Sequence, residues 1–561
     1  MDQNTRGIWD GAILSMNTSG GHLKRYFSSN STTSFWSLSL VAGIGLLFSI
    51  LSLWFHRGSS REPPSLKGFI PIISNTYQYM TDMHGFLQRV AHAQRHSSII
   101  KFRLGPKKIY MVSGEANIQT INQPSRSISP DVFFLQVMQN VWGASKDELA
   151  KFEQDKSGRR KNPIPGHDVA PNQPRLWHGQ HHIYSEYLQR TDHANHLADK
   201  YFQLFADRLT KQPLGEWTEL SLRSFFENDM AEAALVALMG PRLLELNPGF
   251  WPAMWEFARL APQLMWGLPK WVNPKPWKIR DEFHAMCRRY IDAASKDSQS
   301  REIDENSKWE PCYGSRMARE LVKWASENLS LETTAGMVAT FIFGTNANSV
   351  PMSLWAMMEL IADPELYQAV REECIAASTA DPITGQRTFE LEKLMSMPLL
   401  QSVYIETLRL HVSINVTREV TQPITLDGHL LASGSLIQAP SQIGQYNESV
   451  WGSDGHPASE FWAGRHLKRS GGKVEFTMAG RTSSFFPFGG GSSICPGRVF
   501  AKQEIIMTLA ALITRFEIEM IEWTHLDGSR SDRPAQNDLS YIGAVGIPPD
   551  RDMKIRWKRL W

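Results

Sequence analysis

The fold of this chain is decided by residues 488–497, which read FGGGSSICPG. Three consecutive glycines let the backbone turn tightly and approach a flat ligand closely, because no side chain stands in between. Cys495 comes at the head of a predicted helix over 498–516, where unpaired N–H groups and the helix dipole favour a thiolate. A thiolate on a tight loop beside bare backbone is what an axial iron ligand requires. The alternative, a buried cysteine near a C-cap glycine, leaves the spacing of phenylalanine, glycine and cysteine unexplained.

The longer run FPFGGGSSICPGRVFAKQE, residues 486–504, resembles the haem-binding loop of the cytochrome P450 family, whose pattern is F-x-x-G-x-x-x-C-x-G. The resemblance implies that Cys495 is the proximal ligand of haem b iron, with Phe488 and Arg498 as further cofactor contacts. The family usually has Arg or His two residues before the cysteine, where it touches a haem propionate. Ser493 stands there in this chain, which is similar to the sterol-hydroxylase and prostacyclin-synthase branch.

Composition narrows the class of protein. The 561 residues carry 59 basic and 57 acidic side chains, a formal net charge of +2. No long basic run occurs, which disfavours a nucleic-acid partner. The four cysteines, Cys287, Cys312, Cys374 and Cys495, are scattered without C-x-x-C spacing. This pattern argues against a disulfide framework or a structural zinc site and fits a reducing compartment.

The N-terminal region predicts a membrane anchor. Residues 1–33 are rich in Ser, Thr, Asn and Gly without periodicity, which is typical of a disordered tail. Residues 35–55 contain no charged side chain and match the roughly 20 residues that a transmembrane helix needs. Trp36 and Trp54 lie near the two ends, where aromatic belts form. A cleaved signal peptide and a buried core helix are the alternatives, and both fit the length and position of this segment less well.

The orientation of this anchor follows from charge and from the resemblance. More basic residues follow the segment than precede it, which favours a cytosolic body. The resemblance implies a single-pass protein of the endoplasmic reticulum membrane with its catalytic domain in the cytosol. The tail would then be lumenal, and Asn17 in the sequon Asn17-Thr18-Ser19 becomes a candidate for glycosylation.

Residues 56–72 form the predicted junction between anchor and body. They contain Pro63 and Pro64, which fix the backbone angle φ and stop a helix from continuing. The segment resembles the proline hinge that the family places after its anchor. The remainder, 73–561, is expected to be one haem-binding catalytic domain, and the resemblance implies a mainly α-helical fold with small β-sheets.

Two local patterns in the first third of this domain predict structure. Residues 99–104 and 108–112 read as a pair of short strands around Gly105-Pro106. Residues 145–175 are polar, charged and proline-containing, which predicts an exposed loop.

Residues 177–182, WHGQHH, occupy the place where the family has a W-x-x-x-R helix that donates to the haem propionates. The resemblance makes Trp177 and His181 candidate propionate ligands, with His181 at the arginine position. A plain surface helix is the second interpretation. A zinc site is the third, because adjacent histidines on a helix point in different directions.

Residues 331–362 predict the longest helix. Ser330 can cap its start, and Pro351 lies inside it and should bend it. In the family this helix forms an oxygen-binding groove with an acid–alcohol pair, and Asn348 and Ser349 stand there in this chain. Ser349 can donate a proton, whereas an amide such as Asn348 does not titrate. The substitution also suits a haem-thiolate isomerase, and without the cysteine loop it would read as a polar helix kink.

Charged residues after this helix resemble the family's structural motifs. Glu406 and Arg409 form Glu-x-x-Arg, a spacing that puts both on one helix face. The segment 461–466 resembles the family's F-x-P-x-R pattern, so that Arg465 would complete a structural triad behind the haem loop. Arg418, on a predicted strand, is the remaining candidate for a haem propionate, because a planar guanidinium suits a carboxylate.

Together these patterns predict a haem-dependent monooxygenase that inserts one oxygen atom from dioxygen into a lipophilic substrate. No flavin or nucleotide fingerprint is visible, so electrons would come from NADPH through a separate cytochrome P450 reductase. The resemblance suggests a terpenoid or steroid-like substrate in secondary metabolism. The alternatives are a haem-thiolate isomerase or dehydratase, which turns over a peroxide without reductase, and a haem-binding protein without catalysis.

Overall fold

The computed structural model describes the catalytic body of the chain. The described residues are 61–561 apart from 71, 168, 171–172, 266, 301–303, 454 and 544–545. The predicted tail 1–33, the predicted anchor 35–55 and Asn17 lie outside them. Within the described part, no helix is both long enough and apolar enough to cross a membrane.

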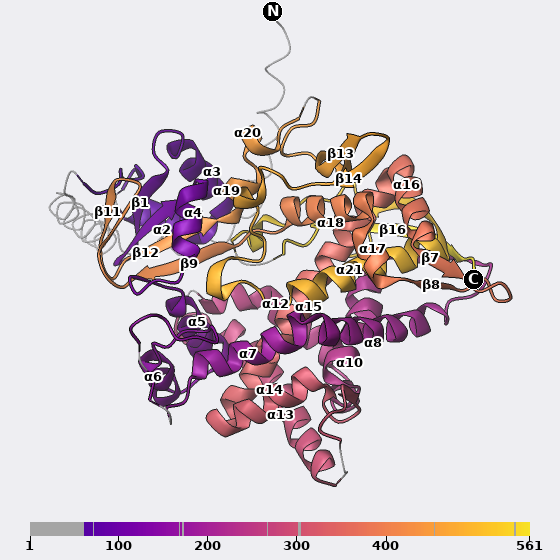
Figure 1. Cartoon of the computed structure of the whole chain (residues 1–561), viewed down its shortest axis with the longest axis horizontal. Coiled ribbons are helices and arrows are strands. Elements are labelled where there is room, and N and C mark those ends of the chain that lie inside the picture. The colour runs from indigo at the N-terminus through magenta and orange to yellow at the C-terminus, as the bar shows by residue number, and fades with distance from the viewer. Residues whose placement is uncertain are drawn as a thin grey trace, which may run out of the picture.

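Helices make up most of the body, as the resemblance implied (Figure 1). The α-helices are α2 (Ile73–Thr81), α3 (Met83–Ala93), α4 (Glu115–Asn122), α5 (Asp131–Val137), α6 (Lys146–Gln154), α7 (Leu176–Gln189), α8 (Thr191–Leu209), α9 (Leu222–Phe225), α10 (Ala231–Met239), α11 (Arg242–Glu245), α12 (Phe250–Met265), α13 (Pro274–Ser300), α14 (Arg316–Asn328), α15 (Leu331–Ala362), α16 (Pro364–Ala376), α17 (Leu391–Ser396), α18 (Pro398–His411), α19 (Ser441–Gln445), α20 (Glu448–Trp451) and α21 (Arg498–Arg515). Two π-helical turns, η1 (Met138–Trp142) and η2 (Phe226–Met230), interrupt them.

The sheets are small and lie at the sides of the helical body (Figure 1). The largest has the order β1-β2-β12-β9-β3, and the next has the order β15-β16-β4. Their strands are β1 (Ile99–Leu104), β2 (Lys107–Val112), β3 (Ile128–Ser129), β9 (Asn415–Val420), β12 (Leu436–Pro440), β4 (Trp217–Ser221), β15 (Phe516–Thr524) and β16 (Asp552–Arg559). Short hairpins complete the set: β5 (Trp309–Glu310) with β6 (Gly314–Ser315), β7 (Ser378–Ala380) with β8 (Arg387–Phe389), β10 (Ile424–Leu426) with β11 (His429–Leu431), and β13 (Leu467–Ser470) with β14 (Lys473–Phe476).

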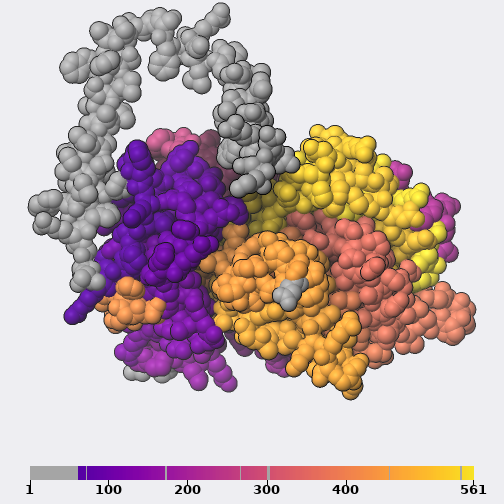
Figure 2. Space-filling model, turned by 90° about the horizontal axis from the view of Figure 1, so that it is seen from above, coloured from indigo at the N-terminus to yellow at the C-terminus, as the bar shows by residue number. Residues whose placement is uncertain are grey.

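The first predicted strand pair is confirmed. Strands β1 and β2 are antiparallel, with Leu104 opposite Lys107 across the turn. Strand β12 then pairs with β2 on one side and with β9 on the other, so Ile437 lies between Tyr110 and Arg418. This pairing places Arg418 next to a segment far away in sequence. In the space-filling view the indigo N-terminal segment and the yellow C-terminal segment lie on different sides, with the orange segment between them (Figure 2).

Helix α15 runs through the centre of the body with the bounds that the sequence predicted. The side chain of Ser330 accepts a hydrogen bond from the N–H of Thr333, so the predicted N-cap is confirmed. Most side chains of α15 are buried against α13, α21, η1 and α18, and Pro351 lies inside the helix. The other elements of the body therefore pack around this central helix.

The predicted exposed loop over 145–175 is wrong in its first half. Residues 146–154 form α6, because Ser145 and Glu148 make a capping box in which each side chain bonds the other residue's backbone N–H. Asp155, Ser157 and Arg159, which follow the helix, are buried. The S-x-x-E signature was readable in the sequence, whereas the burial of a charged arginine depends on partners from other segments.

Two glycines of α15 give a matched test of this packing. A Cβ atom at Gly336 would lie 2.1 Å from the carbonyl oxygen of Trp142 in η1, whereas one at Gly344 would meet nothing within 4 Å. Alanine normally stabilises a helix interior by about 0.5–1 kcal/mol relative to glycine. We expect Gly336→Ala to lower the thermal unfolding midpoint and Gly344→Ala to leave it unchanged or raise it. Equal midpoints for the two variants would contradict the close contact of α15 with η1.

Candidate functional site

The loop 488–497 is a closed turn that only glycine permits at key points. The N–H of Cys495 donates to the carbonyl of Phe488 over 2.9 Å, which fixes the distance between the two ends. Gly491 has a positive φ of 65°, and a Cβ atom there would lie 2.2 Å from the carbonyl oxygen of Asn122. The glycine run is therefore required by the backbone conformation and by the close approach of α4.

Cys495 is accessible to solvent, although protein surrounds most of its side chain. Burial raises the pKa of its thiol, and the N–H groups of Gly497 and Arg498 act in the opposite direction. The predicted preference for the thiolate is therefore wrong for the free side chain, because desolvation outweighs the helix N-terminus. A metal cation bound to the sulfur would deprotonate it outright. The guanidinium of Arg498 donates to the carbonyl of Cys495 over 3.0 Å, and this bond holds the backbone of Cys495 in place.

Arg418 fastens this loop to its neighbours. From β9, its Nε donates to the carbonyl of Ile121 over 3.2 Å, and its Nη2 donates to Asn122 Oδ1 over 2.8 Å and to the carbonyl of Gly490 over 3.0 Å. Burial and the nearby Arg159 lower its pKa to about 10. Most donors of Arg418 are thus committed to protein oxygens. Its first role is to hold the loop, and the propionate contact remains a prediction.

Arg159 is a functional candidate that the sequence did not reveal. Its guanidinium is buried between two rings, 4.4 Å from the centroid of Phe134 and 4.2 Å from that of Trp177, and it pairs with Asp131. Within the described part of the chain, its Nη2 atom is buried without a hydrogen-bond partner. A buried N–H donor that lacks an acceptor is costly, so this atom points to an anionic ligand.

The propionate contact of Trp177 stays a prediction. Its indole N–H already donates to the carbonyl of Phe152 over 3.0 Å. The ring instead supports the cation of Arg159 from one face. The tryptophan therefore positions Arg159, and its own indole N–H is committed to a protein carbonyl.

His181 carries a second unsatisfied group. Its Nδ1 lies 3.2 Å from the hydroxyl of Ser185, and its Nε2 is buried without a partner among the described residues. Burial, followed by the charge of Arg159 and other basic neighbours, lowers its pKa to about 4. His181 is thus neutral and can donate from one ring nitrogen. Arg159, His181, Arg418 and Arg498 influence one another electrostatically, so the site fits a ligand that carries carboxylates, as haem does.

Asn348 and Ser349 face different ways on α15. Asn348 is partly exposed, and its amide donates to the carbonyl of Gly344 and accepts from the N–H of Gly546, both over 2.9 Å. Gly344 itself is exposed, although most of the helix is buried. Ser349 is buried, and its side chain is hydrogen-bonded to the carboxyl group of Glu504 on α21. The amide of Asn348 and the hydroxyl of Ser349 therefore have different hydrogen-bond partners.

Glu504 is a further residue that the sequence did not single out. It is buried in α21, and burial raises its pKa to about 8 in spite of the hydrogen bond with Ser349. The carboxyl group is therefore protonated at neutral pH. Glu504 is the last residue of the segment 486–504 that resembles the haem-binding loop. No sequence spacing predicts that it contacts Ser349 on another helix.

The charged residues behind the loop come together as one buried cluster. Arg409 donates to both carboxylate oxygens of Glu406, over 2.8 and 2.7 Å, and Arg465 donates to one of them over 2.8 Å. His466 and the backbone N–H of Trp462 also bind this carboxylate, at 3.0 and 3.2 Å. Burial alone would raise the pKa of Glu406, but Arg409 and His466 outweigh it and hold the pKa at about 2. The role of His466 was not predicted from the sequence, although His466 directly follows Arg465.

These features are the ones expected of a haem-thiolate protein. They are an accessible cysteine on a glycine loop, a basic cluster that suits carboxylates, and a central helix with polar side chains. The cytochrome P450 family model matches residues 131–527, and the chain belongs to this family. It is 78% identical over 525 residues to the cytochrome P450 monooxygenase calL of Penicillium decumbens, which covers 93% of this chain and 98% of that protein. Its identity to the cytochrome P450 monooxygenase fsoE of Humicola fuscoatra is 30% over 539 residues, 90% of this chain and 88% of the relative.

A third relative is a mammalian enzyme. The cholesterol 7-alpha-monooxygenase of Cricetulus griseus is 23% identical over 553 residues, which is 93% of this chain and 99% of the relative. Family membership makes the protein an oxidoreductase of the cytochrome P450 type.

The Glu406 cluster yields a stability prediction. Removing the charge of Glu406 by Glu406→Gln leaves two arginines buried without a counter-ion, which should cost about 3–5 kcal/mol of unfolding free energy. The exposed Glu327, changed to Gln, is the control and should stay within about 0.5 kcal/mol of the wild type. Chemical or thermal unfolding followed by circular dichroism measures both. A Glu406→Gln protein as stable as the control would refute the central role of the cluster.

The same cluster predicts a dependence on pH. The pKa of Glu406 is about 2, below the ordinary value near 4.3, so its carboxylate contributes stability that is fully present above the ordinary pKa. This contribution is lost as pH falls through the window between about 4 and 2. Wild-type protein should lose stability in that window more steeply than Glu406→Gln.

Proposed function

We propose that the chain binds haem b through Cys495 and inserts one atom of dioxygen into a lipophilic substrate. The observation that carries the proposal is the accessible sulfur of Cys495 on a loop whose conformation requires glycine and is fastened by Arg418. When bound, the haem supplies oxygen activation, for which thiolate donation favours O–O cleavage.

We assign the anchoring of the haem carboxylates to Arg159 and His181. Both offer buried N–H donors without protein acceptors in the described chain, whereas Trp177 has none to offer. Arg418 and Arg498 add positive charge near them. With the carboxylates bound by Arg159 and His181, the site does not need a basic residue at position 493, where the family usually has one and this chain has Ser493.

Groups on two helices, α15 and α21, hold the protons that the reaction needs. Asn348 can hold a water molecule in line through its amide, because it is partly exposed beside the open position of Gly344. Ser349 and Glu504 hold a proton between them in the interior, since Glu504 is protonated at neutral pH. Monooxygenase chemistry needs protons at the oxygen site, and this pair, on α15 and α21, is a buried group that can hold one.

One observation favours a second candidate, an isomerase or dehydratase that rearranges a peroxide. Asn348 does not titrate, and both ends of its amide are bonded to backbone groups. The hydroxyl of Ser349 is hydrogen-bonded to Glu504. Such a reaction requires no proton relay, no NADPH and no reductase, and these requirements distinguish it from oxygen insertion.

The substrate and the electron source rest on relatives and on sequence. The relative from Cricetulus griseus acts on cholesterol, as its name states, and two relatives are fungal monooxygenases. These names support a terpenoid or steroid-like substrate in secondary metabolism. The chain contains no flavin or nucleotide fingerprint, which supports electron delivery from NADPH through a separate reductase.

Exposed apolar side chains support a membrane location. Phe69 is 98% exposed and Tyr77 is 68% exposed, and Ile70 and Ile73 between them are also exposed. They lie at the end of the predicted hinge 56–72 and directly after it, where the body would meet the bilayer. We propose a single-pass anchor over 35–55 in the endoplasmic reticulum, a cytosolic catalytic domain and a lumenal Asn17 that is open to glycosylation.

Cys495→Ala tests the ligation. The wild-type ferrous protein with carbon monoxide should show the red-shifted absorption of a thiolate-ligated haem, and Cys495→Ala should lose it because alanine cannot bind iron. Cys374→Ala, at a buried cysteine outside the loop, is the control and should keep the spectrum. A Cys495→Ala protein with an unchanged spectrum would overturn the proposal.

Arg159→Gln tests the carboxylate anchor. Loss of a charge-assisted hydrogen bond worth about 1.5–3 kcal/mol should speed haem release by roughly tenfold or more. Transfer of haem to an excess of an acceptor protein gives the rate. Arg160→Gln, at the exposed neighbouring arginine, removes the same charge and should leave the rate unchanged. Equal rates for the two variants would exclude Arg159 as an anchor.

A further inference from the structure

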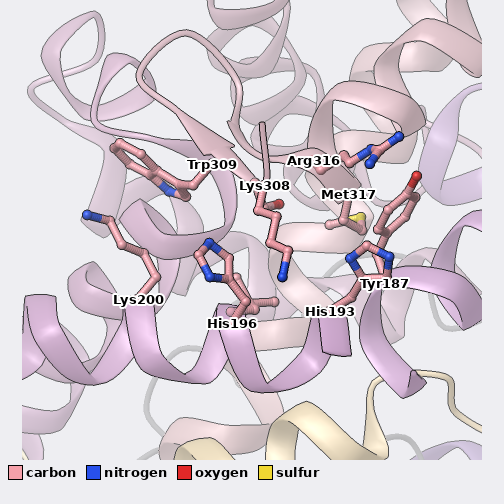
Figure 3. Close-up of a pocket in the computed structure, with 10 residues that line it drawn as sticks. Tyr187, His193, His196, Lys200, Lys308, Trp309, Arg316 and Met317 are labelled. Atoms are coloured by element: carbon pink, nitrogen blue, oxygen red, sulfur yellow. The ribbon is translucent and has the colours of Figure 1, made fainter. Parts of the chain in front are cut away.

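A small basic pocket lies apart from the residues assigned to the haem. It forms where α8 meets the segment that leads into α14, and its cavity volume is about 20 Å³ (Figure 3). Such a volume admits roughly one water-sized group, because one water needs about 10–15 Å³. The ten lining residues include none with a carboxylate: Tyr187, His193, His196, Leu197, Lys200, Lys308, Trp309, Ser315, Arg316 and Met317.

The centre of the pocket is a lysine between two histidines. His193 and His196 are three residues apart on α8 and therefore share one face of the helix. Figure 3 shows the side chain of Lys308 reaching down between their two rings. Lys308 and Lys200 form no salt bridge with any residue that the structure describes. Lys200 lies over the ring of Trp309, 4.2 Å from its centroid, at the side of the pocket.

The charges around the pocket leave its centre positive. His193 lies 3.8 Å from Glu186 and 3.8 Å from Asp192, and both carboxylates are also paired with Arg190. Arg316 pairs with Glu320 at 3.8 Å and points away from the centre.

His196 is the second histidine of the centre. Burial, then Lys308, lowers its pKa, and His193 and Lys200 act in the same direction. Asp199 acts in the opposite direction but is exposed. An anion is the missing partner that would relieve this repulsion between cations.

We infer that this pocket binds a small oxyanion of the phosphate class, held by the ammonium of Lys308 and the ring N–H groups of His193 and His196. One oxygen of a tetrahedral anion fills the cavity, and the others remain at its mouth, where Lys200 and Arg316 flank it. This inference concerns a second site and does not depend on the proposed haem chemistry.

Inorganic phosphate is the probe for this site. Titration of the haem-loaded full chain at constant ionic strength, in a buffer without other oxyanions, should give saturable binding by isothermal calorimetry. Lys308→Gln and His196→Asn should each weaken binding by at least about tenfold, since each removes a hydrogen bond to a charged group. Lys323→Gln, at an exposed lysine of α14, is the matched control and should bind as the wild type does.

Sulfate, which keeps its charge from pH 5 to 8, tests the role of the histidines. Its affinity should rise as pH falls below the ordinary histidine range, because burial and Lys308 lower the pKa of His196 and its protonated ring attracts the anion. Absence of saturable binding by the wild-type protein would overturn the inference, whatever the variants do. It would also be overturned if Lys323→Gln weakened binding as much as Lys308→Gln, which would indicate unspecific surface charge.

Discussion

The carboxylate of Glu406 carries a negative charge where water does not reach, and such a charge persists only if hydrogen bonds replace its hydration. Arg409, Arg465, His466 and a backbone N–H supply them. Both arginines then use their remaining donors on carbonyls of residues 445–460, and Arg481 donates to the carbonyl of Arg465. The cluster thereby ties α18 to the chain that leads into the cysteine loop.

The opposite condition holds on the other side of the loop, where buried N–H donors lack an acceptor. Arg159 and His181 keep buried donors that no described protein atom accepts, and Arg418 joins α4 to the glycine run. A protein that leaves such groups unpaired is less stable without its ligand than with it. The Glu406 cluster thus holds the loop from one side, and we propose that the carboxylates of the cofactor bind the free donors on the other.

The sequence predicted those features that depend on local rules. The bounds of α15, its cap at Ser330 and the placing of Glu406 and Arg409 on one face follow from spacing and capping alone. The residues that it missed or misdirected, Arg159 and Ser349, depend on contacts between distant segments. A buried arginine needs Asp131 and two aromatic rings, and the direction of a serine hydroxyl is set by an acid on another helix.

Isotope labelling tests the central claim most directly. The enzyme, its reductase and NADPH are incubated under ¹⁸O₂ with a terpenoid or steroid that the enzyme converts, and the product is analysed by mass spectrometry. A monooxygenase places one ¹⁸O atom in each newly oxidised product molecule and forms no product without NADPH. Product formed from a hydroperoxide without NADPH or reductase, and free of ¹⁸O, would contradict it.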